Sequence, residues 1–170
     1  MATILYGLEV PDAGGDTMFL SQAAAYEALS DGMKTMLSDL KVVNTNANSY
    51  GKGSQRFTDG VAKAMEVSQA VTNEVTHPVV RTHPETGRKG LYLSDLHFVR
   101  FADMTPQESR PLFDYLVAHA TRPEFTCRFQ WRNGSVAMWD NRCTMHYAIS
   151  DFPNARRIMQ RVTIEGDRPV

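Results

Sequence analysis

The stretch that decides the fold is residues 125–139, with the sequence FTCRFQWRNGSVAMW. In its first half, aromatic residues and a cysteine alternate with polar residues, a period of two that is typical of a strand with one buried face. The dipeptide Asn133-Gly134 follows, and it is the strongest short-range signal for a β-hairpin turn. We therefore expect two antiparallel strands, with residues 135–139 pairing back onto residues 125–131.

Further short strands are predicted on both sides of this stretch. Apolar and β-branched residues fill 2–10, 17–19, 41–45, 78–82, 89–93 and 157–164, while the polar residues 46–60 indicate a long surface loop. Ser21 and Ser30 are typical N-caps of two short helices. Many short strands with a few outer helices favour a mainly β protein of the α+β class, a sandwich or jelly roll, over a parallel α/β sheet.

The longest predicted helix spans residues 106–120. Thr105 and Glu108 have the spacing of a capping box, and Pro106 occupies the first helical position. The helical period places Leu112, Tyr115, Leu116 and His119 on one apolar face. On such a face, we expect His119 to be a hydrogen-bonded core residue.

The composition describes a soluble globular protein in a reducing compartment. The 18 Lys and Arg residues nearly balance the 19 Asp and Glu residues, which gives no electrostatic basis for a nucleic-acid or membrane-surface partner. The apolar runs are too short to span a membrane, and no signal peptide is recognisable. Two cysteines, Cys127 and Cys143, form neither a disulfide framework nor a zinc pattern, so we expect a cytoplasmic protein.

Two groups of polar residues could carry chemistry. His83 and Glu85 have the spacing of two metal ligands, but Pro84 places them in a turn, where we expect both side chains to point to solvent. In the second group, Arg157 and Arg161 follow His146 and would share one face of a strand, so both guanidinium groups could meet anions in one cavity. A solvated strand face explains this second spacing equally well.

The second group lies in a recognisable motif. The runs WDNRCTMHYA at 139–148 and RRIMQR at 156–161 resemble the C-terminal motif of the TauD/TfdA family of Fe(II)/2-oxoglutarate-dependent dioxygenases. The resemblance continues in order through GGDT at 14–17, AAYEAL at 24–29 and HPVVRTHP at 77–84. It therefore covers nearly the whole chain.

The resemblance implies a double-stranded β-helix, the clavaminate synthase-like jelly roll, with Fe(II) held by His-x-Asp and a distal histidine. His146 resembles that distal ligand, and Arg157 and Thr17 resemble the residues that bind the far carboxylate of 2-oxoglutarate. Arg161 resembles the arginine that binds an anionic substrate. His97 falls near a family aromatic residue over the substrate, which implies a more polar pocket. The implied reaction hydroxylates a small, taurine-like sulfonate or carboxylate with O₂ and releases succinate and CO₂.

The sequence departs from the family at the other iron ligands. None of the five histidines begins a His-x-Asp motif, and in the family this motif lies just upstream of the stretch that matches residues 2–10. We therefore expect residues 1–170 to be an N-terminally truncated part of a TauD/TfdA-type domain. One histidine without a carboxylate cannot hold Fe(II) as the family does.

Three functions remain open from the sequence. The first is the dioxygenase. The second is an inactive remnant that binds a dicarboxylate or a partner, with open sheet edges that favour pairing with another chain and so allow a homo-oligomer. The third is a cupin-like metal hydrolase or isomerase that uses His83, Glu85 and His146.

Overall fold

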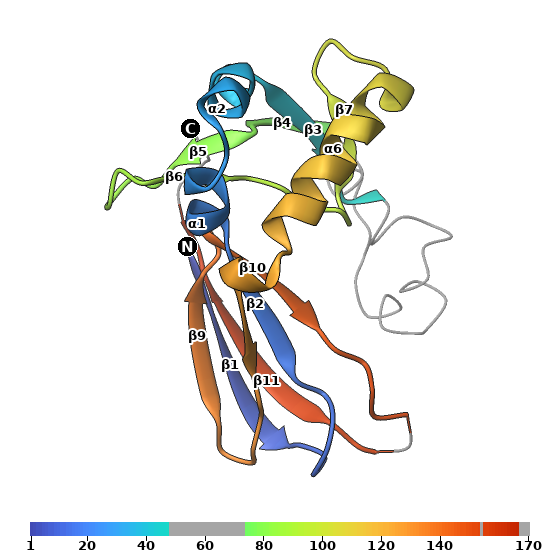
Figure 1. The fold of residues 1–170 in the computed structure, drawn as a ribbon. Coiled ribbons are helices and arrows are strands. Elements are labelled where there is room, and N and C mark those ends of the chain that lie inside the picture. Colours follow the sequence, from blue (N-terminus) through green and yellow to red (C-terminus); the bar gives the residue numbers. More distant parts are fainter. Residues whose placement is uncertain (48–73, 154, 167–170) are drawn as a thin grey trace. The chain divides into compact units, whose positions relative to one another are not determined.

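The computed structural model describes residues 1–47, 74–153 and 155–166, and it divides into two compact units (Figure 1). The first unit combines Met1–Leu29, Thr82–Leu91 and the chain from His119 onward, and the second combines Ser30–Arg81 with Tyr92–Ala118. Most of the loop expected over 46–60 lies outside the described residues. None of the described helices is long and apolar enough to cross a membrane.

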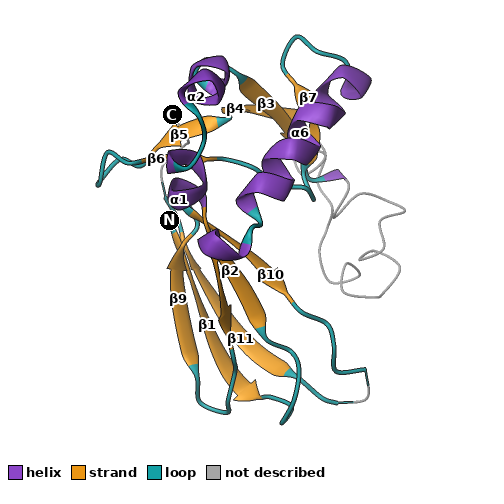
Figure 2. Ribbon diagram, in the orientation of Figure 1, coloured by secondary structure: helices purple, strands orange, loops and turns teal. Residues whose placement is uncertain are grey.

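The first unit contains two three-stranded antiparallel sheets (Figure 2). In the order β11-β1-β9, the first sheet comprises Ile158–Ile164, Ala2–Glu9 and Val136–Asp140. In the order β10-β2-β8, the second comprises Thr144–Ala148, Thr17–Ser21 and Thr126–Phe129. The predicted mainly β character is confirmed.

Aromatic side chains pack the two sheets against each other. The ring of Trp139 on β9 lies 5.1 Å from that of Phe19 on β2, measured between centroids. The buried Trp131 meets Phe129 at 4.8 Å. Leu5, Val10, Ala137 and Met159 complete this core. Burying each large apolar side chain contributes about 1.5–3 kcal/mol, so the inter-sheet core is what holds this unit together.

The turn at Asn133-Gly134 forms, but the predicted hairpin around it is wrong. β8 pairs with β2 while β9 pairs with β1, so the turn connects two different sheets. A type I′ hairpin turn requires positive φ at both central residues, and here only Gly134 has it, at 82°. The Gly134 N–H instead donates to the carbonyl oxygen of Gly7 at 2.8 Å. Contacts distant in sequence therefore decide the pairing.

Short elements surround the two sheets. The helix α1 (Gln22–Glu27) begins at Ser21, whose hydroxyl accepts a hydrogen bond from the Ala24 N–H at 3.2 Å, as predicted. It packs on β6 (Lys89–Leu91) where Gly90 lies, and a Cβ at Gly90 would come within 3.3 Å of the α1 backbone. The strand β5 (Val80–Thr82) precedes a turn that leads to β6, and the 3-10 helix η2 (Pro123–Phe125) leads into β8.

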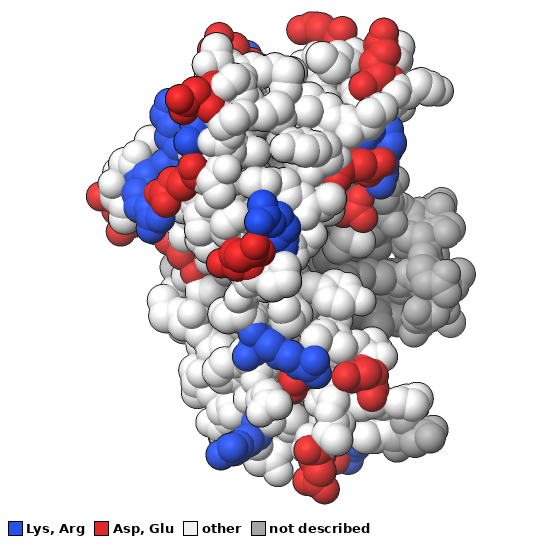
Figure 3. Space-filling model, in the orientation of Figure 1, with Lys and Arg blue, Asp and Glu red and all other residues white. Residues whose placement is uncertain are grey.

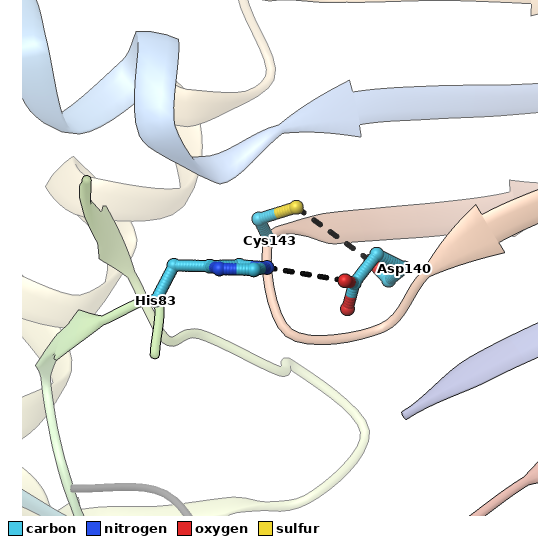
Figure 4. Close-up of side chains that lie close together, drawn as sticks. All are labelled: His83, Asp140 and Cys143. Carbon is cyan, nitrogen blue, oxygen red and sulfur yellow. Dashed lines mark hydrogen bonds and ion pairs between the residues drawn. The ribbon is translucent and has the colours of Figure 1, made fainter. Parts of the chain in front are cut away.

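A buried histidine fixes the turn before β6. His83 is 8% exposed, and its Nδ1 accepts hydrogen bonds from the N–H groups of Glu85 and Thr86 at 3.3 Å each. Its Nε2 lies 3.1 Å from Oδ2 of Asp140 and, as the remaining protonated nitrogen, donates to it (Figure 4). The expectation that His83 points to solvent is wrong because these bonds draw the ring inward. Glu85 is exposed as expected and pairs with Arg142 at 2.8 Å.

Asp140 joins this turn to the turn between β9 and β10. Its carboxylate accepts hydrogen bonds from the Arg142 backbone N–H at 2.8 Å and from the Arg142 side chain, with Nη2 at 2.6 Å. These bonds to Arg142, and the smaller contribution of His83, hold the pKa of Asp140 far below its usual value. The two turns are therefore tied together by a charged network of His83, Asp140 and Arg142.

The second unit is built on one antiparallel sheet of order β4-β3-β7, formed by Glu74–Pro78, Lys41–Thr45 and Phe98–Phe101. Among the described residues, it contains α2 (Asp31–Leu37), capped by the Ser30 hydroxyl as predicted, and most of α6 (Pro106–Ala120), whose residues up to Ala118 belong to it. Its core consists mainly of the buried residues Leu37, Val42, Phe98, Phe101, Phe113 and Leu116.

The capping box at the start of α6 is confirmed. The Glu108 carboxylate accepts the Thr105 N–H at 2.8 Å, and the Thr105 hydroxyl accepts the Glu108 N–H at 3.3 Å. The predicted apolar face is partly wrong, because Tyr115 is 52% exposed while Phe113 is fully buried. His119 is bonded as expected, with Nε2 2.8 Å from the carbonyl oxygen of Ala25.

Replacing Phe113 with alanine should lower the free energy of unfolding by about 3–5 kcal/mol, because its ring stacks on Phe98 with centroids 3.7 Å apart and is fully buried. The matched variant Tyr115→Ala, on the same helix, should cost less than about 1 kcal/mol. Urea unfolding followed by circular dichroism measures both. A larger loss for Tyr115→Ala would contradict the observed orientation of α6.

The variant Asp140→Asn should be less stable than the wild type at neutral pH, since it loses the charged acceptor of Arg142 and His83. A carboxylate with a lowered pKa stabilises the fold above the pKa of the unfolded chain, about 3.9, and loses that contribution as the pH falls toward its lower folded pKa. The difference in urea midpoint should therefore be constant from pH 8 to 5 and shrink below pH 4. A difference independent of pH would show that the charge contributes nothing.

Candidate functional site

His146 lies on β10 and faces the core between the sheets. It is opposite Phe19 on β2, and its ring lies 4.9 Å from the ring of Trp139 and 6.4 Å from that of Phe19. The residue as a whole remains exposed. Contact with these rings and then the positive charge of Arg161 lower the pKa of His146. The imidazole is therefore neutral at physiological pH, the state in which a histidine nitrogen can bind a metal.

Arg161 lies on the neighbouring sheet with its face toward the same space. It is opposite Leu5 in the register of β11 with β1, and Leu5 belongs to the inter-sheet core. Strand alternation therefore directs Arg161 toward the inner face, one of the two alternatives that the sequence left open. The side chain is nevertheless exposed, so it remains solvated at the edge of the sheet.

Arg157 is the most constrained of the predicted residues. It precedes β11, which begins at Ile158, so the prediction that it forms part of that strand is wrong. Its guanidinium carbon lies 5.9 Å from the ring centroids of both Trp131 and Phe152. Its Nε and Nη2 are buried, and no hydrogen-bond acceptor among the described residues meets them. Burial lowers the pKa of Arg157, and a buried charge without a partner is costly unless an anion binds.

Thr17 lies beside the same tryptophan. It begins β2 and is 2% exposed, and the Trp131 Nε1–H donates to its hydroxyl oxygen at 2.9 Å. Because this bond uses only an acceptor position, the hydroxyl hydrogen of Thr17 can still be donated to a ligand. The indole of Trp131 thus contacts both Thr17 and Arg157 and relates the two residues to each other.

A glycine loop before β2 completes the surroundings of Arg157. Gly15 has a φ of +72°, and a Cβ there would lie 3.1 Å from Cδ of Arg157 and 3.2 Å from a ring carbon of Phe152. Sequence reasoning used Gly14-Gly15 only as part of a motif and missed Trp131, Phe152 and the close approach of the loop. The glycine pair was the available signal, since adjacent glycines allow positive φ and close backbone packing.

His97 belongs to the second unit, whereas Thr17, His146, Arg157 and Arg161 belong to the first. Its Nδ1 lies 2.6 Å from the Ser94 hydroxyl, and its carbonyl oxygen accepts the Thr45 N–H at 2.8 Å. These contacts place it just before β7. Its predicted role toward a substrate stays a prediction.

Two hollows in the first unit bear on the candidate site. An apolar pocket of about 640 Å³ lies between the sheets, lined by residues of β2, β8 and β9 such as Phe19, Phe129 and Trp139. A smaller one of about 270 Å³ includes His146 in its wall. Arg157 and Thr17 line neither of these two pockets.

Among the described residues, one group has the composition of a metal site, namely His83, Asp140 and Cys143 (Figure 4). Its ligand atoms lie within 4.8 Å of one another. However, the Arg142 guanidinium already occupies both oxygens of Asp140, and a cation at that point would have to displace it. We therefore interpret the group as a clamp between two turns. His146 is not part of it, and within the described residues His146 has no two further ligands beside it.

Comparisons with known proteins identify the family of this chain. The family model described as "Taurine catabolism dioxygenase TauD, TfdA family" matches residues 1–163. An alkylsulfatase from Acinetobacter baylyi is 38% identical over 97% of this chain and 52% of its own length. An alpha-ketoglutarate-dependent sulfate ester dioxygenase from Pseudomonas putida is 37% identical over 99% of this chain and 56% of its own.

A solved structure is similar over the same range. The crystal structure of AAD-2 in complex with Mn(II) and N-oxalylglycine superposes with a TM-score of 0.83 at 34% identity, covering 99% of this chain and 64% of that one. The jelly-roll fold expected from the sequence is thereby confirmed. The chain spans about half the length of the curated relatives it matches. On this evidence the chain belongs to the TauD, TfdA family of dioxygenases.

Proposed function

We propose that residues 1–170 form part of an Fe(II)/2-oxoglutarate-dependent dioxygenase domain that hydroxylates a small anionic organic compound. The observation that carries this proposal is that two guanidinium nitrogens of Arg157, Nε and Nη2, are buried and meet no acceptor in the described chain. Two parallel N–H groups at the end of a rigid fork match the two oxygens of a carboxylate. The donor set therefore fits the far carboxylate of 2-oxoglutarate.

Each residue of the site has a distinct task in this proposal. Arg157 binds the carboxylate in a bidentate manner, and Thr17 donates its free hydroxyl hydrogen to the same group. Trp131 and Phe152 exclude water from this contact, which strengthens it. The iron and 2-oxoglutarate, when bound, would supply the oxidising chemistry with O₂, and succinate and CO₂ would leave.

The described residues do not form an iron site by themselves. His146 offers one neutral imidazole, and the potential ligand group around Asp140 does not include it. A facial triad requires two histidines and one carboxylate. We propose that His146 is one ligand and that the others come from outside the described residues.

The substrate class follows from the relatives and from Arg161. Their names include a sulfatase, a sulfate ester dioxygenase and a 2,4-dichlorophenoxyacetate dioxygenase, all of which act on anionic compounds. Arg161 faces the same inter-sheet space as His146 and would bind a sulfonate, sulfate or carboxylate group. His97 is proposed as a further substrate contact.

We also propose that the protein is cytoplasmic, that it binds neither nucleic acid nor membranes, and that homo-oligomers form. Acidic and basic side chains are interspersed on the face drawn in Figure 3, which supports the absence of polyanionic partners. The outer strands β10 and β11 are paired on one side only in the described chain, which supports association with a second chain.

A second candidate function is a dicarboxylate-binding domain without catalysis. It is favoured by the incomplete ligand set around His146 in the described part of the chain. In that case Arg157 and Thr17 would bind 2-oxoglutarate without metal.

The Arg157→Gln variant should bind 2-oxoglutarate at least tenfold more weakly than the wild type, because a charge-assisted hydrogen bond contributes about 1.5–3 kcal/mol. Isothermal titration of the chain without metal measures this. The neighbouring variant Arg156→Gln, which loses an exposed arginine paired with Glu9, should change affinity less than about twofold. Equal effects of both variants would sink the assignment.

Succinate formation tests whether the ligands among the described residues suffice for catalysis. With Fe(II), 2-oxoglutarate and O₂, the 170-residue chain should form little or no succinate, since the described residues place only His146 of a three-ligand site at the candidate position. Strong turnover that His146→Ala abolishes would show that the described ligand set suffices.

A further inference from the structure

Two carboxylates, those of Asp16 and Asp151, adjoin the glycine loop against which Arg157 packs. Asp16 follows Gly15 directly, and Oδ1 of Asp151 accepts the Gly15 N–H at 2.7 Å. Gly15 is the residue against which the Arg157 side chain packs. An arginine with buried, unbonded nitrogens would normally pair with a neighbouring carboxylate. Something in the structure must therefore hold the two carboxylates away from Arg157.

Arg128 on β8 performs this task. Its Nε lies 2.6 Å from Oδ2 of Asp16, whose side chain is only 9% exposed, and its Nη2 lies 3.8 Å from Oδ2 of Asp151. The backbone reinforces the arrangement, because the Ile149 N–H donates to the carbonyl oxygen of Asp16 at 2.9 Å. One guanidinium therefore pairs with both carboxylates.

We propose that Arg128 is a positioning residue of the anion site, which holds Asp16 and Asp151 so that neither pairs with Arg157. Arg128 acts without touching the ligand. This inference rests on the proposed role of Arg157 in binding 2-oxoglutarate. It adds that the affinity for a dicarboxylate depends on a second arginine that removes the competing acceptors.

Gly15 is the residue that both Asp151 and Arg157 contact. The bond from its N–H fixes one oxygen of Asp151, while its missing Cβ lets Arg157 come within contact distance of the same residue. Without the charge of Arg128, Coulomb attraction would draw Asp151 or Asp16 toward the partnerless guanidinium. An incoming dicarboxylate would then have to displace an internal ion pair.

The test is a charge-rescue cycle measured by titration with 2-oxoglutarate. Arg128→Gln should weaken binding about fivefold or more, whereas Arg128→Lys, which keeps the charge, should lose about twofold or less. Adding Asp151→Asn or Asp16→Asn to Arg128→Gln should restore affinity to within about twofold of the wild type. Asp16 is buried, so Asp16→Asn would also relieve the structural cost of an unpaired charge, and the exposed Asp151 therefore gives the deciding double variant.

Arg122→Gln is the matched control. Arg122 pairs with Glu124 and is 52% exposed, close to the 50% of Arg128, but it has no contact with the glycine loop. Its loss should leave affinity unchanged. Thermal unfolding of every variant identifies any that fail to fold. If Arg128→Gln is one of these, the comparison of Arg128→Lys with the wild type replaces it.

A second readout does not depend on ligand binding. The Nε–H resonance of Arg157 in a nitrogen-edited NMR spectrum should shift in Arg128→Gln, as a carboxylate pairs with it, and return in the double variants. Normal 2-oxoglutarate binding and an unmoved resonance in Arg128→Gln would overturn the inference and leave the proposed function intact. Absence of binding by the wild type would instead overturn the proposed function, while the resonance still decides the role of Arg128.

Discussion

The site depends on one buried charge that the described chain leaves without an acceptor. The guanidinium of Arg157 lies 5.9 Å from the rings of both Trp131 and Phe152, and its Nε and Nη2 are buried without an acceptor among the described residues. Placing a guanidinium there costs free energy in the free protein. The surrounding elements make this placement rigid, since Trp131 is part of the inter-sheet core and Gly15 closes the opposite side. Such an arrangement is reasonable if an anion normally completes it.

The features that could be predicted from sequence are those that local chemistry determines. The serine caps of α1 and α2, the capping box of α6 and most strand positions depend on neighbouring residues. The pairing of β8 and β9 could not be predicted, because it depends on which sheet each strand joins. His83 was misjudged for the same reason, since its partner Asp140 is far along the chain.

The candidate site, too, could be predicted only in part. His146, Arg157 and Thr17 were found through a motif, and strand register places His146 and Arg161 on facing surfaces. The motif gave no indication that Trp131 connects Thr17 to Arg157, or that Arg128 pairs with Asp16 and Asp151. Family membership explains why these residues occur together. The geometry explains how Arg157 can remain available for a ligand while Arg128 is paired with Asp16.

The account centres on a carboxylate bound to Arg157, and a crystal structure of this chain with 2-oxoglutarate tests it most directly. One carboxylate of the ligand should accept hydrogen bonds from Nε and Nη2 of Arg157 and from the Thr17 hydroxyl, with Asp16 still paired to Arg128. A dicarboxylate bound elsewhere, or an Arg157 paired with Asp151 in the presence of saturating ligand, would contradict the account.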